Sequence, residues 1–165
     1  MYARRSWIPA NNRGVMLTLE LMAELVRRPG AAVQEVAAAI AAGAPGDGFP
    51  AALREWLVAH VFQEQDPRNV ELVRSPEYSL AIIEERGSVA GDCDDVATLS
   101  AAIGRAAGFP VRFIALAWGA DYSHVYAEIM APGPPPIWYE LDIHRPPTAG
   151  TPEPDRELVV YPAVS

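Results

Sequence analysis

The sequence predicts a single domain of the α+β class. Apolar residues recur with helical spacing over the first part of the chain and alternate with a period of two later on, and Pro and Gly separate these segments. Helices that precede strands in this way are typical of α+β folds. The chain has 165 residues, of which 50% are hydrophobic, so it can bury one core. We expect an irregular arm over residues 1–14, one domain over 15–145 and a Pro-rich tail over 146–165.

The expected helices are defined by their apolar faces and by their end signals. Ser75 followed by Pro76 is a helix start signal, because the serine side chain caps the first turn and proline fits the first helical position. The last helix carries a stripe of small residues, Ala97, Ala101 and Gly104, which lets other elements approach closely, so we expect it at the centre of the fold. Helices are predicted over residues 15–28, 31–42, 49–63, 76–86 and 94–107.

The residues that follow have the period of half-buried strands. Strands are predicted over residues 111–118, 123–130 and 137–143. The Pro-rich segment 131–136 is expected to form a rigid hairpin loop between the last two strands. Residues 158–161 are apolar and are expected to add an edge strand. We therefore expect a small antiparallel sheet on which the central helix packs.

The composition limits the classes of function. The net charge is −8, which argues against nucleic-acid binding, since that requires a basic face. A single cysteine cannot form an internal disulfide. The first residues lack the apolar segment of a signal peptide, and no apolar run is long enough for a membrane span. We therefore expect a cytoplasmic protein or a virion-associated one.

Cys93 is the candidate nucleophile. It lies in the sequence GDCDD of residues 91–95, at the start of a predicted helix, where the helix dipole and backbone N–H groups favour a thiolate. The acidic neighbours act in the opposite direction, because negative charge raises the pKa of a thiol. A base must therefore supply most of the activation. His124 on one predicted strand and Asp142 on the next complete a candidate triad of nucleophile, base and orienting group.

The alternation of side chains along the strands tests whether this triad can assemble. If the hairpin is centred on Pro134, Tyr126 faces Asp142 and His124 faces His144. Asp142 then lies on the diagonal from His124, on the same face and within reach of an imidazole. A register shift by two residues places these two residues directly opposite each other, so the pair can meet in either case.

Other residues are weaker candidates at the same site. Glu140 shares the strand face of Asp142 and is the second choice as orienting group. Asp121, in the turn before the strand of His124, is a weaker candidate. The backbone N–H of Cys93 can donate to an oxyanion. The guesses for a second oxyanion donor are Trp56, Gln63 and Gln65. Substrate-groove candidates are Trp118, Tyr126 and Trp138, although aromatic residues on strands more often belong to the core.

The sequence does not favour a metal or a cofactor. Asp92, Asp94 and Asp95 lack the glycine and the distal glutamate of a calcium loop, so their expected role is helix capping. A zinc site made of the candidate triad and His144 lacks a closely spaced ligand pair such as C-x-x-C. We therefore expect neither a cofactor nor a metal.

The motifs resemble those of the transglutaminase-like superfamily. GDCDDVATL at residues 91–99 and GFPVR at 108–112 are similar to its G-x-C-x-D-x-A-x-L helix and its G-x-P-x-R strand. SHVYAE at 123–128 and WYELD at 138–142 resemble its histidine and aspartate strands. The resemblance covers residues 75–145, and the compact form is similar to small bacterial and bacteriophage-encoded members.

The resemblance implies a papain-like α+β fold and cysteine-dependent acyl transfer at amide or peptide bonds through a thioester, by a protease, amidase or transamidase. Cys93 is then the nucleophile, His124 the base and Asp142 the orienting group, and we favour hydrolysis because water is always present. The expected partner is a protein or peptide substrate, with phage or prophage proteins as further partners and with neither nucleic acid nor membrane. Some members have lost activity, so the alternative is a silent binding or structural module, for instance in a phage particle.

Overall fold

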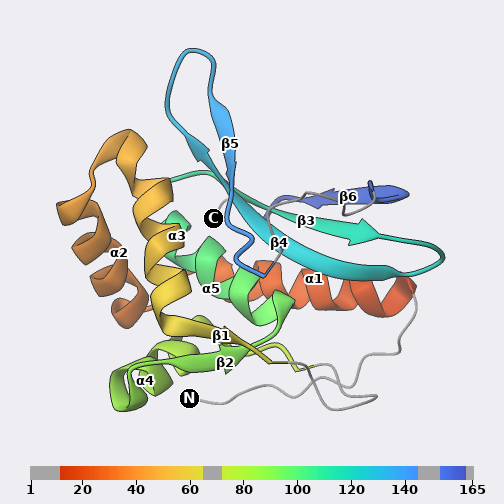
Figure 1. The fold of residues 1–165 in the computed structure, drawn as a ribbon, viewed down its shortest axis with the longest axis horizontal. Helices are drawn as coiled ribbons and strands as arrows, with labels where there is room; N and C mark the ends of the chain where they lie inside the picture. The colour runs from red at the N-terminus through yellow and green to blue at the C-terminus, as the bar shows by residue number, and fades with distance from the viewer. Residues whose placement is uncertain (1–11, 65–71, 145–152, 163–165) are drawn as a thin grey trace.

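The fold consists of an antiparallel sheet with helices packed on one of its faces. The structure, a computed structural model, describes residues 12–64, 72–144 and 153–162. The helices are α1 (Asn12–Arg27), α2 (Ala31–Gly43), the short 3-10 helix η1 (Gly46–Gly48), α3 (Phe49–His60), α4 (Pro76–Arg86) and α5 (Cys93–Ala106). The strands are β1 (Val61–Gln63), β2 (Val89–Gly91), β3 (Val111–Ala117), β4 (Tyr122–Ala131), β5 (Ile137–Glu140) and β6 (Arg156–Val160). Figure 1 shows their arrangement.

The main sheet has the strand order β5-β4-β3-β6 and is antiparallel throughout (Figure 1). The edge strand expected in the tail is confirmed as β6, which pairs with β3. Glu128 of β4 lies opposite Glu140 of β5, which is the register of a hairpin centred on Pro134. The α+β class and the predicted hairpin register are therefore confirmed.

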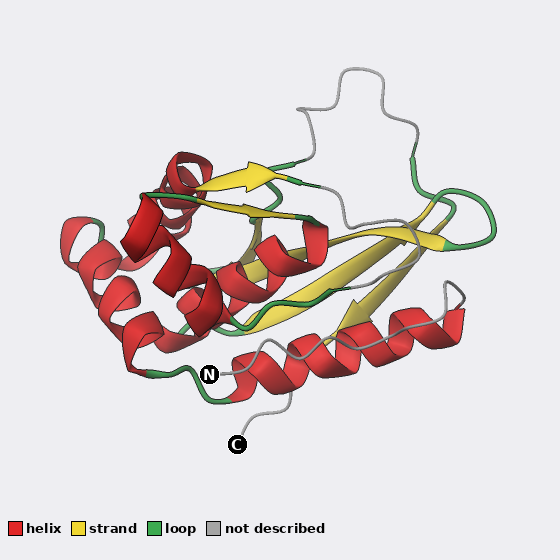
Figure 2. Ribbon diagram, turned by 90° about the horizontal axis from the view of Figure 1, so that it is seen from below, coloured by secondary structure: helices red, strands yellow, loops and turns green. Residues whose placement is uncertain are grey.

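Helices α1 and α5 cover the same face of this sheet (Figure 2). Every residue of α5 from Asp94 to Gly104 is buried, because α1, α2, α3 and α4 all contact this helix in addition to the sheet. The predicted central position of this helix is therefore confirmed. The core shared by α1, α5 and the sheet includes Leu19, Met22, Val26, Val96, Leu99, Ile103, Phe113, Ala115, Val125, Ala127 and Ile129.

The helix expected to continue to Gln63 ends at His60, so this prediction was wrong. Residues Val61–Gln63 instead form β1, which pairs in parallel with β2. The cause is tertiary, because the hydrogen-bonding partner lies 28 residues further along the chain at Val89, and the β-branched Val61 suits a strand.

The strand expected to continue to Ile143 ends at Glu140, which is a second correction. Leu141 still donates its N–H to β4, and the chain then turns away. The turn is stabilised by Asp142, whose side chain accepts a hydrogen bond of 3.1 Å from the backbone N–H of His144. Aspartate commonly makes this local bond two residues along the chain, and it ends the strand here.

Helices α2 and α3 form an apolar pair on the side of α5 away from α1. Both contact α5. Among the described residues, no single helix has the length and apolar character needed to cross a membrane. Residues Ala31–Gly43 and Gly46–His60 meet those requirements only together, as a pair bent by 115°.

The N-terminus of α5 is anchored by an ion pair to the segment that precedes α4. Arg74 Nη1 lies 2.6 Å from Asp95 Oδ2, and the Arg74 backbone N–H donates to Asp95 Oδ1 at 2.7 Å. Arg74 Nη1 also donates to the carbonyl of Ala90 on β2 at 2.6 Å. A Cβ at Gly91 would lie 3.0 Å from the Cβ of Asp95, so the strand approaches the helix closely. These contacts fix the turn that presents Cys93.

Gly104 allows the close packing of α5 on β4. A Cβ at this position would lie 2.6 Å from Cγ2 of the fully buried Ile129. We expect Gly104→Ala to lower the free energy of unfolding by about 1 kcal/mol, because the overpacking cost of roughly 1–3 kcal/mol exceeds the gain in helix propensity. Urea unfolding measures this difference.

The matched control for this substitution is Gly43→Ala, since a Cβ at Gly43 would meet nothing within 4 Å. This variant should be neutral or slightly stabilising. In an Ile129→Ala background, Gly104→Ala should become stabilising, because the clash is absent and the propensity gain remains. Equal effects of Gly104→Ala in both backgrounds would contradict the steric explanation.

Candidate active site

Cys93 is the first residue of α5 and lies directly after strand β2 and the N-cap residue. The N-cap is Asp92, whose side chain accepts a hydrogen bond of 3.4 Å from the backbone N–H of Asp95. The cysteine is partly buried and packs against the main core. At this position the positive end of the α5 dipole favours a negatively charged sulfur.

His124 on β4 and Asp142 after β5 are in direct contact. Nε2 of His124 lies 2.5 Å from Oδ2 of Asp142, so the imidazole and the carboxylate are hydrogen-bonded. The Asp142 side chain is only 2% exposed, and its other oxygen accepts the backbone N–H of His144. A carboxylate held at both oxygens has a fixed direction and orients the imidazole in turn. The predicted proximity of His124 and Asp142 is therefore confirmed.

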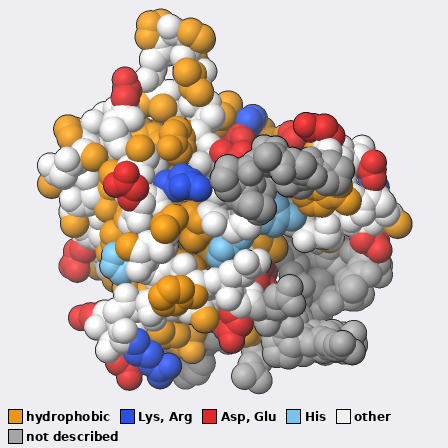
Figure 3. Space-filling view, in the orientation of Figure 1, with side chains coloured by type: hydrophobic (Ala, Val, Ile, Leu, Met, Phe, Trp, Pro, Cys, Tyr) orange, Lys and Arg blue, Asp and Glu red, His pale blue; other side chains and the backbone are white. Residues whose placement is uncertain are grey.

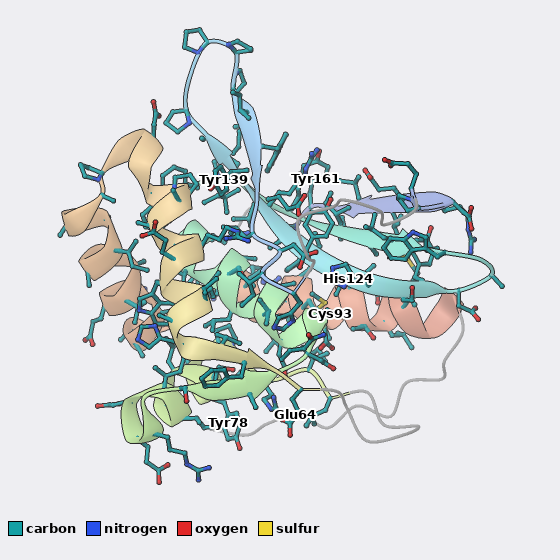
Figure 4. The ribbon with its side chains drawn as sticks, in the orientation of Figure 1. Glu64, Tyr78, Cys93, His124, Tyr139 and Tyr161 are labelled. Atoms are coloured by element: carbon teal, nitrogen blue, oxygen red, sulfur yellow. The ribbon has the colours of Figure 1, made fainter. Side chains whose placement is uncertain are left out.

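The thiol of Cys93 and the imidazole of His124 border the same cavity. Cys93 and His124 line one cavity together, and Figure 4 shows them as neighbours. Cys93 and Asp142 also line a narrow cavity with Tyr126, which is too small to admit a water molecule. Because Asp142 engages Nε2, the ring nitrogen that can serve the thiol is Nδ1. The structure thus brings together the three residues of the candidate triad.

The two weaker carboxylate candidates lie elsewhere. Glu140 is exposed at the end of β5, and Asp121 is exposed in the turn between β3 and β4. Neither residue lines a cavity at Cys93. Asp142 is therefore the better placed orienting group.

The predicted oxyanion donors differ in position. Trp56 stacks on the imidazole of His60, one turn further along α3, with ring centroids 4.5 Å apart. It lines neither cavity at Cys93. Gln63 ends β1 opposite Gly91, two residues before Cys93, and its side chain is exposed. Gln65 lies outside the described residues. Gln63 is close to Cys93 along the β1–β2 pair but, like Trp56, lines neither cavity at the thiol.

The three aromatic groove candidates differ in their positions relative to Cys93. Tyr126 stacks on His124 with ring centroids 6.1 Å apart and lines the narrow cavity. Trp118 packs against the smaller apolar cluster of Ile114, Leu116 and Tyr126 and lines neither cavity at Cys93. Trp138 lies beneath the guanidinium of Arg112, whose Cζ is 4.1 Å from the centroid of the tryptophan ring. The expectation that the two tryptophans line a groove at the thiol is not met, because their rings pack against other parts of the sheet.

The aspartates around Cys93 make structural contacts. In the described part of the chain, Asp92, Asp94 and Asp95 form the acidic group whose oxygens lie close enough together, within 4.8 Å, to hold a metal ion. Asp95 pairs with Arg74, while Asp92 and Asp94 both accept the backbone N–H of Asp95. These contacts are consistent with the predicted capping role.

His144 is a second imidazole beside the candidate triad. It lines the narrow cavity, and its Nε2 is buried without a hydrogen-bond partner among the described residues. Burial lowers the pKa of His144 from the usual 6.5, and the charge of His124 acts in the same direction, while Asp142 and Asp92 oppose the shift. A buried neutral imidazole makes the stability of the fold depend on pH.

The sign of this dependence follows from proton binding. Near pH 6 the unfolded chain binds more protons at His144 than the folded chain, so this stability is fully present above about pH 6.5 and is lost as pH falls from there through the lower pKa of the folded state. We expect the free energy of unfolding of His144→Gln to fall less than that of wild type between pH 7.5 and 5.5. Urea unfolding at a series of pH values measures both slopes, and parallel curves would contradict the prediction.

The larger cavity extends from Cys93 to helix α1. Its volume is about 230 Å³, and α1 contributes Val15, Thr18, Leu19 and Met22 to its wall. The other walls come from β3, β4 and the start of α5. Figure 3, in the orientation of Figure 4, shows histidine side chains at the surface near the centre of this face, bordered by hydrophobic groups. Sequence reasoning missed the role of α1, because an apolar stripe predicts a buried face but not its partner.

The fold and the site together define a class of protein. In an α+β domain, a thiol at a helix N-terminus lies beside an imidazole and a carboxylate from adjacent strands, the arrangement of Cys-His-Asp and Cys-His-Asn enzymes. A family model of the transglutaminase-like superfamily matches residues 34–143, more than half of the chain. The chain therefore belongs to the transglutaminase-like superfamily, whose members are mostly cysteine enzymes. Helix α1 and strand β6 lie outside the matched residues.

The fold is also similar to a solved structure. The chain resembles the crystal structure of a "putative protease" from Parabacteroides distasonis ATCC 8503 with a TM-score of 0.56 and 13% sequence identity. The similarity covers 79% of this chain and 29% of that chain, so this chain spans less than a third of that protein. At such low identity the likeness shows the shared fold alone. Comparison with curated proteins gives no significant match.

Proposed function

We propose that this protein is a cysteine-dependent enzyme that cleaves amide or peptide bonds through a thioester, with Cys93, His124 and Asp142 as its catalytic residues. The observation that carries the proposal is the 2.5 Å contact between His124 and the buried Asp142 carboxylate, beside a thiol at a helix N-terminus. Such a carboxylate fixes the tautomer of the ring and stabilises the imidazolium that forms when the ring takes a proton. A thiol flanked by aspartates needs this assistance.

The first half-reaction forms the thioester. Nδ1 of His124 takes the thiol proton, and the sulfur of Cys93 attacks the carbonyl carbon of the substrate. The oxygen of the tetrahedral intermediate becomes negative and can accept a hydrogen bond from the Cys93 backbone N–H. When the carbon–nitrogen bond breaks, the imidazolium returns its proton to the leaving amine or ammonia.

The second half-reaction releases the acyl group. A water molecule gives a proton to His124 and attacks the thioester carbonyl, and the sulfur leaves and regains its proton from the ring. The products are a carboxylic acid and the original thiol. A primary amine in place of water would give a new amide instead. We favour hydrolysis of a protein or peptide substrate, because water is always present whereas an amine has to be supplied.

A mass-spectrometric screen tests the proposal. The protein is incubated with a mixture of peptides that contain glutamine, with and without a small primary amine. Cleavage adds one water to the two fragments together, deamidation replaces an amide NH2 by OH, and transamidation incorporates the amine with loss of ammonia. We expect one of these products from the wild type and at least about a 10⁴-fold lower rate from Cys93→Ala.

The silent-module alternative makes the opposite prediction. A non-catalytic domain would give equal product from the wild type and Cys93→Ala with every peptide. Its Cys93 would also be alkylated by iodoacetamide no faster than a free thiol. Product formation that requires the amine would retain the acyl-transfer mechanism and replace hydrolysis by transamidation.

A further inference from the structure

One wall of the cavity beside Cys93 comes from residues outside the range that matches the family model. Helix α1 ends at Arg27, whereas the family match begins at residue 34. Leu19 and Met22 are 1% and 0% exposed, so their positions are fixed by packing against the core. Val15, at the other end of the same face, is only partly buried and lies at the rim. One face of α1 therefore forms a rigid surface opposite the thiol.

The lining of this cavity combines an aliphatic side on α1 with polar residues at the start of β4, where Tyr122 and Ser123 line it. The aliphatic groups of α1 face Ala115 of β3 and Val125 of β4 across it. Thr18 donates its hydroxyl to the carbonyl of Gly14 at 3.2 Å, so its hydrogen is already engaged within the helix. Apart from the candidate catalytic pair, Asp92 is the charged residue that lines the cavity in the described part of the chain. Asp92 disfavours a carboxylate in this cavity, and the aliphatic side on α1 favours an uncharged side chain.

The size of the cavity matches one side chain. A cavity of about 150 Å³ with an apolar lining is known to accept benzene. Ligand pockets for drug-sized molecules have volumes of about 300–1,000 Å³. The volume of 230 Å³ lies between these values, so it suits a single side chain of the size of leucine or methionine and not a longer stretch of peptide.

We propose that the cavity between α1 and β4 is the specificity pocket of the enzyme and binds one aliphatic side chain of the substrate, close to the carbonyl that Cys93 attacks. The inference rests on the proposed function, because the cavity selects a substrate only if the thiol reacts. Helix α1, outside the matched residues, then determines selectivity, and the residues of the match carry the chemistry.

Short peptidyl chloromethyl ketones test this pocket without knowledge of the natural substrate. The sulfur of Cys93 displaces chloride from such a probe and forms a stable thioether. Two sets are compared, with the varied side chain either on the residue that carries the ketone or on the preceding residue. The side chain at that position is leucine, methionine, phenylalanine, alanine, glutamate or lysine. We expect leucine and methionine probes of one set to inactivate at least about tenfold faster than alanine, and glutamate to be the slowest.

Variants of α1 locate the effect. Val15→Phe should fill the rim and lower the ratio of the leucine rate to the alanine rate several-fold, while Val15→Ala should raise the rate of a phenylalanine probe relative to leucine. The matched control is Leu17→Phe, because Leu17 lies on the outer face of α1 and is 48% exposed. This control should keep the wild-type ratio. Each probe rate is divided by the iodoacetamide rate of the same variant, and the thermal midpoint verifies that each variant is folded.

The outcomes separate the two claims. Rates that do not depend on the side chain, with Cys93 still reactive toward iodoacetamide, would overturn the pocket and leave the proposed function intact. A preference for glutamate or lysine would overturn the aliphatic assignment. A Leu17→Phe effect as large as that of Val15→Phe would also count against the pocket. A thiol that reacts with no probe faster than free cysteine would remove both proposals.

Discussion

Replacing His124 with alanine should make the reaction of Cys93 with iodoacetamide strongly pH-dependent. A free thiol has a pKa near 8.5, so its thiolate fraction falls about tenfold for each pH unit below that value. A thiolate paired with an imidazolium keeps its charge in mild acid, although its intrinsic nucleophilicity is lower. We therefore expect the wild-type rate to remain nearly constant down to pH 5. There the variant should be about tenfold slower or more.

Stopped-time alkylation followed by mass spectrometry of the intact protein measures these rates, since the chain contains one cysteine. The matched control is His60→Ala, which removes an imidazole on α3 that lines neither cavity at Cys93. It should retain the wild-type pH profile. A His124→Ala profile that coincides with that of wild type would refute the role of this histidine as the activating base.

Replacing Arg74 with alanine should have the largest effect on stability. Its partner Asp95 is 5% exposed, and Arg74 itself is 17% exposed, so the ion pair lies largely out of water. Removal of one member of a buried pair typically costs about 3–5 kcal/mol, because the remaining charge has lost its compensation. We expect a decrease of about 3 kcal/mol in the free energy of unfolding, measured in urea.

The matched control for this variant is Arg86→Ala. Arg86 and its partner Glu85 are 3.7 Å apart and are 69% and 70% exposed, so removal of this ion pair should change stability little. A second substitution, Asp95→Asn, should recover part of the loss in the Arg74→Ala background, since it removes the buried charge. Equal effects of Arg74→Ala and Arg86→Ala would show that the buried pair does not anchor α5.

Much of the candidate site could be predicted from local patterns. The Pro-rich loop and the alternation along two strands gave the observed register, in which Glu128 lies opposite Glu140. That register places Asp142 beside His124, and the small residues of α5 indicated a central helix. These features depend on neighbours in sequence or on one hairpin, so they can be deduced before the tertiary structure is known.

Most of the missed features depend on contacts between distant segments. Strand β1 pairs with β2 across α4, and the pairing of Val61 with Val89 has no local signal. Arg74 reaches Asp95 over 21 residues, and nothing in the sequence near either residue announces it. The apolar stripe of α1 had the correct period, but period alone does not identify the surface that it covers.

The aromatic candidates show a related limit. Trp118 directly follows β3 and Trp138 lies on β5, and their rings nevertheless line neither cavity at the thiol. Large aromatic side chains gain most of their stabilisation from burial, and both faces of a sheet can provide it. Residue type and strand position therefore predict burial of an aromatic ring better than they predict its role.

Strand β6 has a consequence for the solubility of the folded chain. It pairs along β3 from Phe113 to Ala117 and thereby occupies backbone groups that would otherwise form an open sheet edge. Open edges with apolar side chains pair readily with other chains. Strand β6 thus moves the open edge of the sheet from the apolar β3 to a shorter strand that begins with the charged residues Arg156 and Glu157. A chain cut before Arg156 would expose β3 as a template for aggregation while leaving Cys93, His124 and Asp142 unaltered in sequence.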